Sequence, residues 1–241
     1  MSDLILSQPD GDVTTITLNR PEIGNRLSDT MIAQLAVGID TAAKVSRLII
    51  LRGAGEDFCL GREAMGKREA VSEAFLVRGK TEVIFDCYDA LRRSPVPVIG
   101  VVQGRAVGFG CALAALCDMT IASDKGRFQL PEMAHHIMPT IAMSALVDRV
   151  PRKALLYLVY STDEIDAHRA LSFGLASNVV PANNLQSAVD HLVDRLKALP
   201  LPALMAVKEY VRFAYGMDTA AANDFAKNLH ATINSYSAMK P

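Results

Sequence analysis

The residues best suited to chemistry are glycines at the start of an expected helix. Gly104, Gly108 and Gly110 stand between an apolar run at 98–102 and a helical segment of small residues at 110–116. Glycines this dense at a strand-to-helix junction let the backbone approach another group closely. The first turn of a helix also presents unpaired N–H groups and a partial positive charge.

A single carboxylate follows these glycines. Glu132 lies twenty residues beyond Ala112, in an otherwise apolar neighbourhood. Backbone N–H donors aimed at a developing oxyanion, with a carboxylate base nearby, suit enolate chemistry on a carbonyl or thioester. Taken alone, such a glutamate is usually solvated, and such glycines usually only let a helix pack on a strand. The residues by themselves leave both interpretations open.

The glycine pattern does not match the common nucleotide-binding motifs. Gly108-Phe109-Gly110 is followed by Leu113 where a dinucleotide fingerprint needs a third glycine. No Gly-Lys-Ser/Thr follows, so a phosphate-binding P-loop is excluded.

The elements that must position these residues alternate between strands and helices. Alternating or apolar stretches predict strands at 4–7, 13–19, 47–51, 98–102, 119–122 and 178–180. Helical spacing predicts helices after the N-cap Ser28, at 71–91 and at 108–116, mainly helical structure from 140, and three helical segments from 185. This pattern indicates an α/β fold.

Composition narrows the function classes. The chain has 241 residues, 50% of them hydrophobic, and a formal net charge of −1, which argues against a general electrostatic hold on nucleic acid or an anionic membrane. No apolar run approaches the roughly 20 residues of a membrane span, and no secretory signal is visible. Cysteines 59, 87, 111 and 117 form no Cys-x-x-Cys pair, so we expect reduced, buried thiols in a cytoplasmic protein.

Four motifs in order resemble the crotonase, or enoyl-CoA hydratase/isomerase, family. They are the strand and turn at 15–28, Phe-Cys-x-Gly-x-Glu at 58–63, the run from Gln-Gly-x-Ala-x-Gly-x-Gly-Cys at 103–111 to Phe-x-x-Pro-Glu at 128–132, and the late helix and strand at 167–181. The resemblance implies a spiral of β-β-α units over residues 1–184. It also implies a helical region at 185–241 that packs in trimers or in a pair of trimers.

The resemblance also implies an enzyme of acyl-CoA thioesters, with coenzyme A as part of the substrate and no permanently bound cofactor. The backbone N–H groups of Leu60 and Phe109 are expected to form the oxyanion hole, and Glu132 to transfer the proton. Ala112 stands where the family carries its first catalytic glutamate. Since losing one acid/base group typically costs about 10²–10⁴ in rate, isomerisation is favoured over hydration. The alternatives are a hydratase with an altered acid/base set and a non-catalytic binding or assembly subunit.

The remaining expectations concern substrate and CoA binding. Residues expected to line this part of the site are Arg26, Cys59, Gly61, Arg62, Gly108, Gly110, Ala112, His136 and Thr140. Arg62 and Glu63 suit either a solvated pair or the acyl pocket, and Lys67, Arg68 and Lys80 could add charge for the phosphates. A metal site around Glu132, His135 and His136 would lack further ligands of suitable spacing, so no metal is expected.

Overall fold

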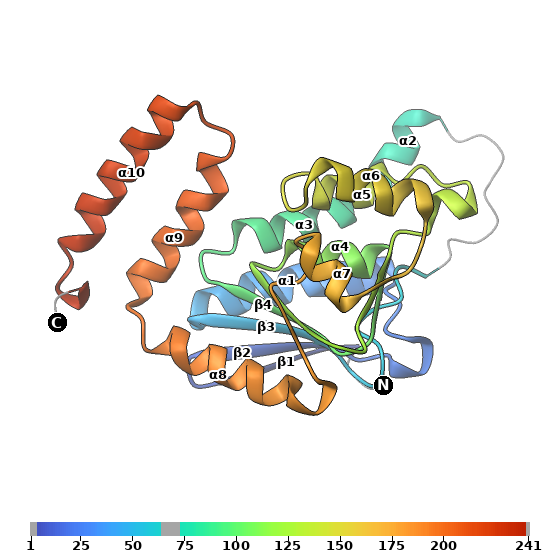
Figure 1. The fold of residues 1–241 in the computed structure, drawn as a ribbon, viewed down its shortest axis with the longest axis horizontal. Helices are drawn as coiled ribbons and strands as arrows, with labels where there is room; N and C mark the ends of the chain where they lie inside the picture. The colour runs from blue at the N-terminus through green and yellow to red at the C-terminus, as the bar shows by residue number, and fades with distance from the viewer. Residues whose placement is uncertain (1–3, 64–72, 240–241) are drawn as a thin grey trace.

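The chain is organised around a twisted sheet of six strands, seen in a computed structural model that describes residues 4–63 and 73–239 (Figure 1). The sheet order is β1-β2-β3-β4-β6-β9, with β1 antiparallel to β2 and every later pair parallel. Its strands are β1 (Ile5–Asp10), β2 (Val13–Leu18), β3 (Leu48–Gly53), β4 (Val98–Val102), β6 (Met119–Ser123) and β9 (Asn178–Val180). A second sheet has the order β5-β7-β8, made of β5 (Arg105–Val107), β7 (Arg127–Gln129) and β8 (Ile165–Asp166).

Helices cover both faces of the larger sheet and extend beyond it. The α-helices are α1 (Asp29–Val45), α2 (Ala74–Gly79), α3 (Glu82–Arg93), α4 (Phe109–Leu116), α5 (Thr140–Leu146), α6 (Arg152–Ser161), α7 (Ala167–Ser172), α8 (Leu185–Lys197), α9 (Leu201–Ala214) and α10 (Thr219–Asn234). The 3₁₀ turns are η1 (Pro21–Ile23), η2 (Glu132–His135), η3 (Ala182–Asn184) and η4 (Ser237–Met239). The expected α/β class with a helical C-terminal region is confirmed.

The apolar pattern of β3 explains why the sheet is covered on both sides. Ile49 and Leu51 belong to the main core cluster, with residues of α1, α3 and α4. Leu48 and Ile50 point the other way, into a second cluster that includes Leu185 of α8. A strand in a parallel sheet is buried on both faces in this way, which is why its sequence is continuously apolar.

One expected helix is two helices. The predicted helix at 71–91 begins among residues outside the described part, and the chain then forms α2 and α3, separated at Lys80 and Thr81. Phe75 of α2 is 80% exposed, so it does not share the buried face of α3 that holds Ile84 and Tyr88. Gly79 ends α2, in keeping with the low helix propensity of glycine.

The second sheet was not predicted, although it positions the glycine run. Its strands have two or three residues, too few for a period-2 pattern to show in the sequence. β5 pairs in parallel with β7 and leads directly into Gly108 and α4. Part of the backbone that leads into the expected site is therefore held by a strand that periodicity does not reveal.

The C-terminal helices divide into one that packs on the sheet and two that project from it. Leu185 and Val189 of α8 are buried against the sheet, whereas α9 and α10 extend away from it (Figure 1). The expected division at 184/185 stays a prediction. Among the described residues, no helix combines the length and apolar character needed to cross a membrane.

A buried ion pair attaches α9 to the core. Lys208 Nζ lies 2.7 Å from Asp118 Oδ2, and it also donates to the carbonyl oxygens of Val96 at 3.0 Å and Leu91 at 3.3 Å. The same carboxylate oxygen accepts the backbone N–H of Val98 at 2.7 Å. Burial lowers the pKa of Lys208, and the charge of Asp118 opposes that shift. The pair joins α9 to the loop between α4 and β6.

Candidate active site

The turn between β5 and α4 requires glycine. Gly108 has φ 54° and ψ −116°, a backbone conformation that side chains rarely allow. Its N–H donates to the carbonyl of Gln129 at 2.8 Å, which joins the turn to β7. This conformation lets α4 begin immediately after the strand.

The loop at 58–62 lies directly against the start of α4. A Cβ on Gly110 would meet the carbonyl oxygen of Cys59 at 2.1 Å, so only glycine allows the two backbones to touch. Val107 N–H donates to that same oxygen at 2.9 Å. Gly110 therefore serves the close packing of two backbone segments. This packing brings the loop at 58–62 to the N-terminus of α4.

Two side-chain amides hold the loop that precedes this segment. Asn25 is fully buried, and its Nδ2 donates to the carbonyls of Ala54 and Asp57, both at 2.8 Å. Gln103 Nε2 donates to Gly53, Gly55 and Asp57 at 3.0, 3.1 and 2.9 Å. These bonds satisfy buried carbonyls and fix the path of the loop.

The oxyanion role expected for Leu60 is wrong. Its N–H already donates to the carbonyl of Gly24 at 2.8 Å, so it is not available to a ligand. The N–H of Phe109, by contrast, has no acceptor in the described part of the chain, as expected for the first residue of a helix.

The N–H of Arg62 is the second free donor. Arg62 forms a parallel bridge with Leu27, in which Leu27 N–H donates to Gly61 and Glu63 N–H donates to Leu27, both at 3.0 Å. In this pattern the N–H of Arg62 itself points away from Leu27, and it has no partner among residues 4–63 and 73–239. A Cβ on Gly61, next in the chain, would lie 3.9 Å from Phe109 N, so the two donors are close in space.

Glu132 lies at the same place. A Cβ on Gly108 would be 3.1 Å from Glu132 Oε1, and Glu132 Oε2 is buried without a hydrogen-bond partner among the described residues. Burial raises the pKa of this carboxyl, while the charge of His135 lowers it. A carboxylate with a raised pKa, beside two N–H donors and a helix N-terminus, can accept a proton from a carbon next to a polarised carbonyl.

An aromatic pair closes one side of this arrangement. The rings of Tyr88 and Phe109 are stacked with centroids 5.5 Å apart, and both side chains are buried. Tyr88 Oη has no hydrogen-bond partner in the part of the chain that the structure describes. Ala112, one helical turn after Phe109, is fully buried. Sequence reasoning did not single out Tyr88, because its contact with α4 arises only through the packing of α3.

The basic and cysteine side chains of the expected site have partners within the protein. Arg26 Nη1 donates to the carbonyl of Leu60 at 2.7 Å, and Arg62 Nη2 lies 2.6 Å from Asp29 Oδ1. Glu63 pairs with Arg20. The thiol of Cys59 donates to the carbonyl of Asn25 at 3.3 Å. Arg62 and Glu63 are therefore in ion pairs with other residues, and Cys59 has a packing role.

His136 and Thr140 lie on the exposed side of the site. His136 ends η2 in a left-handed conformation with φ 55°, and Thr140 begins α5. Both are exposed. The histidine whose charge acts on Glu132 is His135, not His136. Lys80 is exposed at the end of α2, and Lys67 and Arg68 lie outside the described residues.

All four cysteines are free and buried, as expected. Burial raises the pKa of each thiol to about 12, so they are protonated and unreactive at neutral pH. Among the described residues, no group of three or more His, Cys, Asp or Glu side chains is placed to hold a metal ion.

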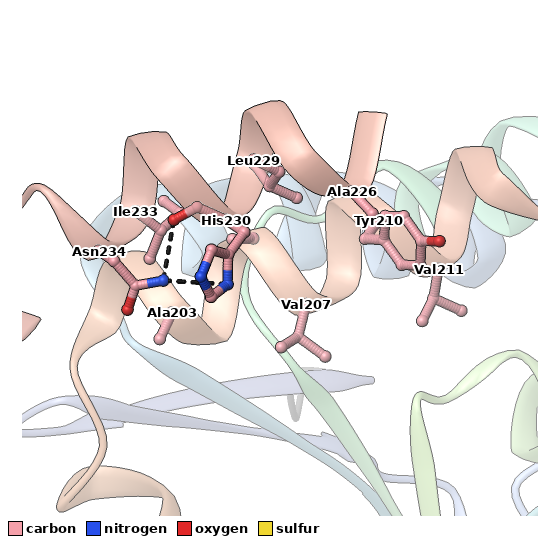
Figure 2. Close-up of a pocket in the computed structure, with 10 residues that line it drawn as sticks. Ala203, Val207, Tyr210, Val211, Ala226, Leu229, His230, Ile233 and Asn234 are labelled. Atoms are coloured by element: carbon pink, nitrogen blue, oxygen red, sulfur yellow. Dashed lines mark hydrogen bonds between the residues drawn. The ribbon is translucent and has the colours of Figure 1, made fainter. Parts of the chain in front are cut away.

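Figure 2 shows a mostly apolar groove between α9 and α10. It is lined by Ala203, Ala206, Val207, Tyr210, Val211, Ala226, Leu229, His230, Ile233 and Asn234. Its residues come only from the two projecting helices, so the groove is separate from Glu132 and α4.

Sequence comparisons place the chain among known proteins. The Enoyl-CoA hydratase/isomerase family profile matches residues 9–240. The 2,3-dehydroadipyl-CoA hydratase of Escherichia coli is 31% identical over 216 residues, covering 88% of this chain and 82% of that protein. Human enoyl-CoA hydratase domain-containing protein 3 is 32% identical over 202 residues, covering 82% of this chain. The match spans only 65% of the length of that human protein.

Solved structures agree with the expected spiral fold. An enoyl-CoA hydratase of Mycobacterium smegmatis superposes with a TM-score of 0.90 at 28% identity, covering 97% of this chain and 91% of that one. A protein of Thermobifida fusca, described as an enoyl-CoA hydratase and solved with CoA, has a TM-score of 0.84 at 29% identity, covering 95% and 92%. The expected fold is confirmed.

Proposed function

Because this chain belongs to the enoyl-CoA hydratase/isomerase family, we propose that it is an enzyme of acyl-CoA thioesters that works through an enolate. The observation that carries the proposal is the meeting of two free backbone N–H groups and one partly buried carboxylate at the start of α4. Donors placed for a developing oxyanion stabilise an enolate more than the carbonyl it forms from. The non-catalytic alternative loses support, because it gives no reason for a carboxylate oxygen to be buried without a partner.

The thioester oxygen is proposed to bind the N–H groups of Phe109 and Arg62. Glu132 then removes a proton from the carbon next to the thioester carbonyl, and negative charge moves onto the thioester oxygen. Arg62 takes the role first expected for Leu60, whose N–H is bonded to Gly24. The side chains of Phe109 and Arg62 are not the donors in this step.

Ala112 bears on the choice between the two reactions named for the family. With Glu132 as the single carboxylate, one group can remove a proton from one carbon and return it to another, which moves a double bond between positions 2 and 3. We therefore favour isomerisation. The second candidate is hydration of a 2-enoyl thioester, supported by the hydratase name of the Escherichia coli relative.

The CoA portion is proposed to lie on the exposed side of the loop at 59–62. Arg26 is exposed there and donates to the carbonyl of Leu60, so its charge is close to the thioester site. The related Thermobifida fusca structure holds CoA, which supports this part of the proposal. Exposed Lys80 is a second candidate for the phosphates.

The test is turnover on a panel of saturated, 2-enoyl and 3-enoyl CoA thioesters. We expect a 3-enoyl thioester to be converted to its 2-enoyl isomer. The absorbance of the conjugated 2-enoyl thioester measures this conversion. Gly108→Val should abolish turnover, since its side chain meets Glu132 in a backbone conformation that valine rarely adopts. Phe109→Leu should retain much of the turnover, because the N–H survives. If both variants fold and lose turnover equally, the ring of Phe109, and not its N–H group, is required for turnover.

The proposed oligomer is a trimer or a pair of trimers. Val207, Val211 and Phe213 of α9 are 66%, 45% and 44% exposed, which is more apolar helix surface than a monomer usually leaves in water. The groove of α9 and α10 adds to this surface.

Sedimentation of the 26.0 kDa chain at micromolar concentration should give three or six times the monomer mass. Val207→Asp should shift the distribution toward monomer, because it places a charge on the proposed interface. Val37→Asp, at a similarly exposed site on α1, is the matched control and should not. A stable wild-type monomer would contradict the proposal.

A further inference from the structure

Tyr88 carries a buried hydroxyl group that the proposed mechanism does not use. Its side chain is 2% exposed, and Tyr88 Oη has no hydrogen-bond partner within residues 4–63 and 73–239. A buried polar group without a partner is costly, and such groups are rare in native proteins. This cost is not explained by packing, because phenylalanine would fill almost the same space.

The surroundings of this hydroxyl place it at the active site. The Tyr88 ring stacks on Phe109, the residue whose N–H is proposed to bind the thioester oxygen. Burial raises the pKa of the Tyr88 hydroxyl, and the charge of Glu132 adds to this shift while that of Arg62 opposes it. The phenol therefore stays protonated at neutral pH, so it can donate a hydrogen bond but cannot act as a base.

Ala112 explains why a donor is useful there. Residues 109 and 112 are neighbours on one face of α4, because they are three positions apart in a helix. Ala112 offers only a buried methyl group at this position. Tyr88 stacks on Phe109, the neighbour of Ala112 on this face, and brings a polar side chain to the same turn of α4. Glu132 Oε2 and Arg62 Nε are likewise buried without a hydrogen-bond partner in the described part of the chain.

We propose that the Tyr88 hydroxyl is a substrate-binding group beside Glu132, and that it donates a hydrogen bond to an oxygen on the third carbon of the acyl chain. The inference rests on the proposed acyl-CoA function and narrows it. An oxygen at that carbon is the group that hydration adds, so recognition by Tyr88 would support hydration, the second candidate reaction of the proposed function. The phenol makes and breaks no covalent bond in this role; Glu132 still moves the proton.

The test compares two thioesters of equal chain length. Acetoacetyl-CoA has an oxygen on the third carbon, and butyryl-CoA does not. Calorimetric titration should show that the wild-type protein binds acetoacetyl-CoA at least about tenfold more tightly. Tyr88→Phe keeps the stacked ring but removes the donor, so it should reduce this preference about tenfold while changing butyryl-CoA affinity less than about threefold.

Tyr157→Phe is the matched control. Tyr157 also belongs to an aromatic pair, with Phe173, but its hydroxyl group donates to Asp163. It should leave the preference unchanged. An unchanged preference in Tyr88→Phe, or no preference in the wild-type protein, overturns the role of Tyr88 but leaves acyl-CoA binding intact. If neither thioester binds the wild-type protein, the proposed function fails as well. The two failures are therefore distinguishable.

Discussion

Replacing Glu132 by glutamine should lower turnover on acyl-CoA thioesters by about 10²-fold or more. Glutamine keeps the size and the hydrogen-bonding capacity of the side chain, and it removes the basicity. The Phe109 and Arg62 N–H groups are untouched, so the dissociation constant of a saturated acyl-CoA should be nearly unchanged. Steady-state kinetics on 3-enoyl and 2-enoyl thioesters, with calorimetric binding of butyryl-CoA, measures both quantities.

Glu63→Gln is the control for this prediction. Its carboxylate lies on the same loop as Arg62 but pairs with Arg20, so turnover should stay within a few-fold of wild type. Ala112→Glu supplies a second carboxylate and should raise hydration relative to isomerisation, unless overpacking at this fully buried position disturbs α4. Near-full turnover in Glu132→Gln would show that Glu132 is not the base.

The raised pKa of Glu132 adds a pH signature to the same variant. Since the base must be ionised, the acid limb of the profile of kcat/KM should lie above the ordinary range of a glutamate. A raised pKa means that the folded state binds this proton more tightly than the unfolded state. Its contribution to stability is therefore present at low pH and is lost as pH rises through the folded pKa. Glu132→Gln should remove that part of the pH dependence of unfolding.

Lys208→Met should destabilise the fold by about 3–5 kcal/mol, measured by chemical denaturation at fixed protein concentration. The substitution preserves the long apolar stem but leaves the carboxylate of Asp118 partly buried without its cation. It also removes donors from the carbonyls of Val96 and Leu91. The first helix to loosen should be α9, since the pair is one of its polar links to the core, besides the bond from Arg212 to the carbonyl of Arg93.

Lys227→Met tests whether this cost is specific to the buried pair. Lys227 pairs with Asp224 in a fully solvent-exposed contact on α10, which should be worth well under 1 kcal/mol. Adding Asp118→Asn to Lys208→Met should recover part of the loss, because the unpaired charge is then gone. Equal destabilisation by the two lysine variants would mean that the buried pair does not hold α9.

The sequence predicted those elements whose signals are local. The strand cores of β3 and β4 are continuous apolar runs, and Ser28 accepts the N–H of Met31 as an N-cap should. The break between α2 and α3 escaped detection, because the apolar spacing around Phe75 continued the pattern of α3 although that side chain is exposed. β5, β7 and β8 escaped because pairing with distant segments, not periodicity, makes them strands.

The site divides along the same line. Gly108 and Glu132 were predicted as neighbours, and the structure brings them together. The choice between the N–H groups of Leu60 and Arg62 depends on Gly24 and Leu27, which lie more than thirty residues earlier in the chain. The sequence of the loop at 58–63 does not indicate which of its N–H groups bond to Gly24 and Leu27. The position of Tyr88 depends likewise on how α3 packs on α4.

The contact between Gly110 and the Cys59 carbonyl has a consequence for how such a protein can change. Both proposed donors belong to the main chain, and glycine packing holds them in place regardless of the side chains at 62 and 109. Substitutions at these two positions can therefore reshape the acyl pocket while the electrostatic machinery persists. Such a protein can evolve new substrate preferences by substitutions in its pocket, whereas replacement of Gly110 alone would abolish its activity.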